Sequence, residues 1–203
     1  QVKVKVCIDP GHGGEDSGAV GVSNGYFESH GVLDIGLRLR ELLLPHMEVM
    51  MTRDTDEFVS LSQRCKVANN DPAGVDIFVS IHLNSADTDA SGWEVFTSGS
   101  TKSRELANDI GYRQAECFPL QKNRGVKQEG FYVLRNTKMP AVLWEGCFLS
   151  NYEESKWVTE DDTRQAMAVS ICLGVLDYFN ITTANQQTTL EERVAKIERH
   201  LGL

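Results

Sequence analysis

Stretches with the period of a β-strand alternate along this chain with stretches of helical period, and this order limits the folds that the chain can adopt. Residues 2–9 (VKVKVCID) alternate along a strand, whereas apolar residues recur at helical spacing from Val32 to Leu42. Further strands are expected at 46–53, 76–84, 92–98, 131–135 and 141–149, and further helices at 60–69, 102–117 and 166–176. This order predicts an α/β fold with a twisted, mostly parallel sheet flanked by helices on both faces.

The C-terminal tail departs from this pattern. We expect residues 1–181 to form one domain, residues 182–188 a polar linker, and residues 189–203 an amphipathic helix as a short C-terminal appendage. The apolar residues of that helix have the 4-3-4 spacing of a coiled-coil seam and are Leu190, Val194, Ile197 and Leu201. Three alternatives stay open: the helix packs on the domain, it joins copies of the chain into a homo-oligomer, or it leads to a further binding module.

Charge and composition argue against some kinds of partner. The chain has a net charge of −9 and no cluster of Lys and Arg, whereas nucleic acid phosphates are bound by such clusters. No apolar run approaches the roughly 18 residues of a membrane span, and the N-terminal segment lacks the apolar core of a signal peptide. The five cysteines are well separated and form no CxxC pair, so we expect reduced core residues rather than disulfides.

Polar residues that could bind a ligand or take part in catalysis follow or interrupt three of the expected strands. Ligands of open α/β sheets bind beyond the carboxyl ends of the strands. His12 lies just past the first strand, in the glycine-rich segment CIDPGHGGEDSGAVG, and His82 lies near the end of FVSIHLN. Glu145 interrupts the apolar strand AVLWEGCFL, where a carboxylate is costly unless it is paired, bound to a metal or catalytic. Taken singly, each histidine also fits a solvated loop residue or a core residue.

Two histidines that converge with a carboxylate indicate a zinc site, in which one coordination position stays open for water. The third ligand is expected to be an Asp or Glu on a neighbouring loop. Glu28, at the start of the first helix, is the best candidate, with Glu15 and Asp16 as rivals. An acidic residue at a helix start also has a structural explanation, because it complements the helix dipole.

Five motifs that occur in order carry a resemblance to a known family: CIDPGHGGEDSGAVG, GYFES, MTRDTDEFVSLSQRCKVAN, FVSIHLNSA and RGVKQEGFYVLRNTKMPAVLWEGCFLSN. Together they resemble the zinc-dependent N-acetylmuramoyl-L-alanine amidases of the Amidase_3 type, over residues 2–181. The resemblance implies one Zn²⁺ ion held by His12, Glu28 and His82, with Glu145 as the catalytic general base. The implied reaction is hydrolysis of the peptidoglycan amide between the lactyl group of N-acetylmuramic acid and L-alanine.

Some positions depart from the family pattern or have weaker support. Cys147 stands where the family usually has glycine, which we interpret as a tolerated packing change, since Cys is small and apolar. Asp9 is a candidate to orient a ligand imidazole, although a turn residue before a proline is an equal alternative. Asn84 and Arg135 are candidates for contacts to the glycan or the peptide.

A rival hypothesis is a catalytically silent module of the same fold that binds or regulates the cell wall. The presence of all three implied ligands and of Glu145 disfavours it, because a binding module has no need of a buried base. The resemblance also implies action at the bacterial cell wall, by an extracellular or periplasmic enzyme or by a phage endolysin released from the host cytoplasm. The absent signal peptide favours the endolysin.

Overall fold

One six-stranded sheet organises the protein, of which the computed structural model describes residues 4–181. The strand order is β2-β1-β3-β6-β4-β5. All neighbouring strands are parallel except β4 and β6, which are antiparallel, so the mostly parallel sheet is confirmed. The strands are β1 (Lys5–Pro10), β2 (Glu48–Met51), β3 (Ile77–Asn84), β4 (Trp93–Thr97), β5 (Asn123–Gln128) and β6 (Ala141–Phe148).

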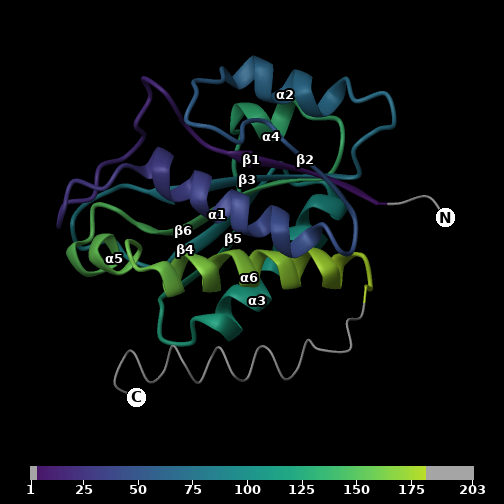
Figure 1. Ribbon diagram of the computed structural model, residues 1–203. Helices are drawn as coiled ribbons and strands as arrows, with labels where there is room; N and C mark the ends of the chain where they lie inside the picture. Colours follow the sequence, from purple (N-terminus) through teal and green to yellow (C-terminus); the bar gives the residue numbers. More distant parts are fainter. Residues whose placement is uncertain (1–3, 182–203) are drawn as a thin grey trace.

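Helices cover both faces of the sheet, as predicted. In Figure 1, α2 and α4 lie above the sheet, and α1, α3 and α6 lie below it. The short α5 follows the last strand. The helices are α1 (Glu28–Leu43), α2 (Leu61–Asn69), α3 (Thr101–Cys117), α4 (Tyr132–Asn136), α5 (Tyr152–Trp157) and α6 (Asp161–Tyr178).

The two faces of β3 show how the sequence pattern directs the packing. Ile77, Val79 and Ile81 belong to the larger core, between the sheet and helices α1, α3 and α6. Phe78 belongs to the smaller core, between the sheet and helices α2 and α4. Successive side chains of a strand point to opposite faces, so His82 lies on the side of Phe78. The same alternation places Glu145 on the side of Leu143, which is also part of the smaller core. The two polar side chains therefore share one face of the sheet.

One predicted strand is wrong. Residues 131–135 are not extended: α4 covers Tyr132–Asn136. Its buried residues, Val133 and Leu134, fit either a strand or one helical turn, and a run of five residues cannot separate the two. The strand in this region is β5, which lies at the edge of the sheet. Its charged and glycine-containing sequence (NRGVKQ) lacks the apolar alternation that marks a half-buried strand.

Other predictions can be compared with the structure directly. All five cysteines are buried thiols, as expected for core residues. Within residues 4–181, no helix combines the length and the apolar character needed to cross a membrane. The proposed linker and C-terminal helix, with the seam of Leu190, Val194, Ile197 and Leu201, lie outside the described residues, so self-association stays a prediction.

Candidate metal centre

The glycine-rich loop after β1 presents His12 in an unusual backbone conformation. His12 has φ of 56°, in the left-handed region that few residues other than glycine adopt. Two glycines of this loop, Gly11 and Gly18, leave room for the side chains of His82 and Glu28. A Cβ atom on Gly11 would lie 2.2 Å from Cε1 of His82, and one on Gly18 would lie 2.6 Å from Oε2 of Glu28. The glycines thus allow the loop to approach two other chain segments closely.

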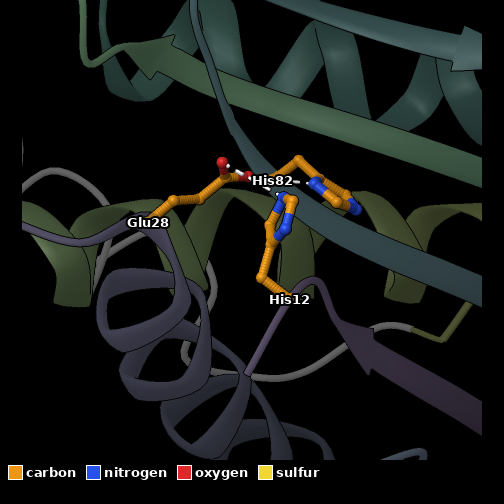
Figure 2. Close-up of side chains that lie close together, drawn as sticks. All are labelled: His12, Glu28 and His82. Atoms are coloured by element: carbon orange, nitrogen blue, oxygen red, sulfur yellow. Dashed lines mark hydrogen bonds and ion pairs between the residues drawn. The ribbon is translucent and has the colours of Figure 1, made fainter. Parts of the chain in front are cut away.

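His12, Glu28 and His82 come together from three elements (Figure 2). Each offers one ligand atom, and these atoms lie within 4.8 Å of one another. Glu28 is the first residue of α1, and His82 lies near the end of β3. Nε2 of His12 lies 3.2 Å from Oε2 of Glu28, and Nδ1 of His82 lies 2.9 Å from Oε1. This group of three could hold a metal ion.

The carboxylate of Glu28 is fixed by backbone donors as well. The amide of Ala19 donates to Oε2 at 2.9 Å, and the amide of Leu83 donates to Oε1 at 3.0 Å. Burial alone would raise the pKa of Glu28, but hydrogen bonds from His12 and His82 outweigh it and hold the pKa below its usual range. The group is therefore a carboxylate at neutral pH, which is the form that binds a metal ion.

Asp16, a rival third ligand in the sequence, has another place in this cluster. Its Oδ2 lies 2.9 Å from Nδ1 of His12, the ring nitrogen that does not face Glu28. Burial would lower the pKa of His12, but Glu28 and Asp16 outweigh that effect and raise it. Metal-binding histidines commonly use their second nitrogen for such a contact, which fixes the ring orientation and the tautomer.

Two buried arginines support the backbone of the loop. Arg53 is 2% exposed, and its Nη2 donates to the carbonyl oxygens of Gly11 at 2.7 Å and of Ser29 at 2.9 Å. Arg64 is 3% exposed, donates to the carbonyl oxygen of His12 at 2.7 Å, and pairs with Asp9 at 2.9 Å. These bonds tie the loop that carries His12 to residues distant in sequence. Unpaired, such buried charges would be strongly destabilising.

Glu145 lies beside the cluster, on the neighbouring strand. Its Cα pairs with that of His82 in the parallel β3–β6 ladder. The side chain is half-buried, and its Oε2 has no hydrogen-bond partner among the described residues. Burial raises the pKa of Glu145 well above its usual value, and the carboxylates of Glu28 and Glu94 raise it further. A buried carboxylate oxygen without a partner is uncommon and calls for a functional explanation.

A cavity of about 520 Å³ opens onto these groups. His12, Asp16, His82 and Glu145 line its polar side. Its other wall is apolar and comes from the start of α2, the segment before it and the start of α4: the residues are Phe58, Leu61, Phe131 and Tyr132. These four side chains are between 40% and 54% exposed, so the wall faces solvent and is accessible to a large substrate.

The profile of a protein family described as N-acetylmuramoyl-L-alanine amidase (Amidase_3) matches residues 6–177. The chain belongs to this family. The amidase CwlM of Bacillus licheniformis is 34% identical over 183 residues, which cover 88% of this chain and 70% of CwlM. The endolysin of Bacillus phage SPP1 is 34% identical over 185 residues, covering 87% of this chain and 66% of the endolysin.

Solved structures agree with this assignment. The catalytic domain of CwlV, an N-acetylmuramoyl-L-alanine amidase from Bacillus (Paenibacillus) polymyxa var. colistinus, superimposes with a TM-score of 0.83 at 36% identity. The match covers 88% of this chain and 99% of that domain. The predicted family and fold are thus confirmed by comparisons that extend over most of the chain.

The remaining predicted residues of this amidase-family chain, Asp9, Asn84 and Arg135, contact groups other than the cluster of His12, Glu28 and His82. Asp9 lines the cavity, but its carboxylate is bonded to Thr52, Arg64 and Ser80 rather than to an imidazole, so it acts on His12 only through Arg64. The amide of Asn84 donates to Glu94 at 2.7 Å. Arg135 lines a different cavity, between the ends of α3 and α4.

Cys147 is fully buried within the larger core. Burial raises the pKa of its thiol well above the usual value, and nearby carboxylates add to the effect. The thiol therefore stays protonated and unreactive at neutral pH. The interpretation as a packing residue is consistent with this position.

Proposed function

We propose that this chain is an N-acetylmuramoyl-L-alanine amidase that hydrolyses the peptidoglycan amide between the lactyl group of N-acetylmuramic acid and L-alanine. The observation that carries this proposal is the cluster of His12, Glu28 and His82, whose two histidines line one open cavity together with Glu145. Family membership supports it independently. The place of action is then the bacterial cell wall, for a cellular enzyme or for a phage endolysin.

The donor set fits one zinc ion. Zinc in hydrolytic sites takes three protein ligands, drawn from His, Asp and Glu, and leaves a fourth position open. The two imidazole nitrogens lie 3.2 Å (His12) and 2.9 Å (His82) from the carboxylate oxygens of Glu28. Two imidazoles and one carboxylate at this spacing can close around an ion of that size. A bound zinc ion would supply a Lewis acid for the scissile carbonyl and would lower the pKa of water. Asp16 would keep the ring of His12 in position.

Glu145 is proposed as the general base. It lies one strand from His82 and lines the same cavity, and its Oε2 has no competing partner among the described residues. A carboxylate in this position can accept the proton of the attacking water and return it to the amino group of L-alanine as the C–N bond breaks. Arg53 and Arg64 contribute indirectly, by holding the backbone on which His12 is placed.

The function is tested by the chemistry of its product. Purified peptidoglycan is incubated with the protein, and newly exposed amino groups are labelled and identified as N-terminal L-alanine. We expect this product to appear, to be lost after treatment with a chelator, and to return when zinc is added. Release of reducing sugar ends, or of amino groups from other residues, would contradict the proposal.

The catalytically silent module is separated by the same assay. A module that only binds the wall would pellet with peptidoglycan but would release no L-alanine amino groups, with or without zinc. The amidase accounts better for Glu145, because a binding module gains nothing from a buried carboxylate oxygen without a partner.

A further inference from the structure

A second buried carboxylate lies directly beside Glu145. Glu94 on β4 pairs with Glu145 in the antiparallel β4–β6 ladder, and its side chain is on the same face of the sheet as Phe96, in the smaller core. Three polar side chains therefore follow one another across neighbouring strands: His82, Glu145 and Glu94. Glu94 is 4% exposed, and like charges at such a spacing repel unless one is neutralised.

Two cations from β5 neutralise Glu94. Nε of Arg124 lies 3.1 Å from its Oε2, and Nζ of Lys127 contacts the same oxygen. Burial would raise the pKa of Glu94, but these two partners outweigh it and lower the pKa. Two positive charges therefore face the Glu94 carboxylate, and Arg124 also interacts electrostatically with Glu154.

A bulge in the sheet places Arg124 in this group. Trp93 pairs with Asn123 and Val95 pairs with Val126, so β5 has one residue more than β4 between these two pairs. Gly125, with φ of 80°, allows the turn of the backbone at this point. Bulges re-aim side chains and are common beside active sites.

The guanidinium of Arg124 is held in place by part of its hydrogen-bond donors, and the others remain without a hydrogen-bond partner among the described residues. Its Cζ lies 4.9 Å above the ring of Phe148, and Nε is bonded to Glu94. Within residues 4–181 its two Nη atoms make no hydrogen bond, and the side chain is 27% exposed. Four N–H donors in a fixed plane therefore remain available, and this geometry suits a carboxylate.

The distance from Glu145 fits a carboxylate further along the peptide of the substrate. Neighbouring strands lie about 4.8 Å apart, so β5 is about 10 Å from β6, across β4. An extended peptide spans about 3.4 Å per residue. The peptide segment one or two residues beyond the scissile amide and the long side chain of Arg124 together cover the distance between β6 and β5. The stem peptide of peptidoglycan carries a free carboxyl group at its second residue, D-glutamate, unless that group is amidated.

We propose that Arg124 and Lys127, organised by Glu94, form a subsite that binds the free carboxylate of the second stem-peptide residue. The inference rests on the proposed amidase function. It makes the protein selective for stem peptides with a carboxylate over those with a carboxamide at this position. A purely structural role of the two cations, neutralising Glu94, would make no such distinction.

The test uses two disaccharide-peptides that differ only in whether the α-carboxyl group of D-glutamate is free or amidated. We expect the unmodified protein to have a KM about tenfold lower for the free acid, the lower end of the range for a charged hydrogen bond, because Arg124 is partly exposed. In Arg124→Gln most of this preference is lost, with kcat little changed, and Lys127→Gln reduces it by a smaller amount. Arg124→Lys keeps the charge but loses the fork, and is expected to be intermediate.

The ratio between the two substrates is its own control for folding, since a damaged protein loses activity on both. Arg104→Gln, at an exposed position on α3, is the matched control and is expected to keep the full preference. Equal KM values for both substrates in the unmodified protein, or an unchanged ratio in Arg124→Gln, would overturn the inference. Absence of L-alanine amino groups from whole peptidoglycan would instead overturn the proposed function.

Discussion

Asp16 offers the sharpest test of how the cluster is built. Its Oδ2 lies 2.9 Å from Nδ1 of His12, so Asp16→Ala removes the group that fixes the ring while leaving all three proposed ligands in place. Loss of such a supporting contact typically weakens metal binding 10- to 100-fold. Because the Asp16 side chain is 45% exposed, we expect the lower end, about tenfold, which equals about 1.4 kcal/mol.

The assay is competition for zinc against a chromophoric chelator at fixed pH. Asp16→Asn keeps an acceptor oxygen without the charge and is expected to show a smaller loss. Glu15→Ala, at an exposed neighbouring position, should bind zinc as the unmodified protein does. Equal zinc affinity in Asp16→Ala and Glu15→Ala would refute the reasoning that Asp16 orients His12.

Two further predictions concern the scaffold. In Gly18→Ala the new Cβ would lie 2.6 Å from Oε2 of Glu28, at a backbone φ of 65°. We therefore expect lower thermal stability together with weaker zinc binding. A Gly18→Ala variant that matches the unmodified protein in both thermal stability and zinc affinity would contradict the close packing. Asp34 joins α1 to α6 through Arg164 at 2.5 Å, and Asp34→Asn should cost about 1 kcal/mol or less at pH 7 in urea unfolding, since the carboxylate is a third exposed. Burial alone would raise the pKa of Asp34, but Arg164 and Arg38 outweigh burial and lower the pKa below its ordinary value of 3.8. The contribution of Asp34 to stability is therefore complete above pH 3.8 and is lost as the pH falls below that value. A difference between Asp34→Asn and the unmodified protein that persists unchanged at pH 2 would contradict this assignment.

The strands and their polar ends could be predicted because their signals are local. Period-two alternation identifies β3 and places His82 on a defined face, and a polar residue at the end of a parallel strand points to the edge where ligands bind. The convergence of His12 and His82 follows from this rule. Glu28 had weaker support, because a first-turn carboxylate also serves the helix dipole. The resemblance to the amidase family, rather than the pattern, favoured it over its rivals.

Other features could not be predicted because they depend on the fold of a loop or on contacts between segments distant in sequence. Asp16 is close to His12 in sequence, but its contact with the ring depends on the fold of the loop, which has a bridge between residues 13 and 16. Arg53 and Arg64 act on backbone carbonyl oxygens of other segments, and such contacts leave no local pattern. Both lie within the motifs that carry the family resemblance, which was the one available signal. Likewise, β5 is recognisable only from its partner β4.

The central claim is that His12, Glu28 and His82 hold zinc while Glu145 moves the proton. The most direct measurement is zinc content and L-alanine release in the same preparation of Glu145→Gln, which preserves the shape of the side chain but cannot accept the proton. The account predicts one zinc ion per chain and a loss of at least about 100-fold in rate, as for removal of a general base, whereas the exposed control Glu129→Gln keeps both. Full activity of Glu145→Gln, with zinc bound, would contradict the account.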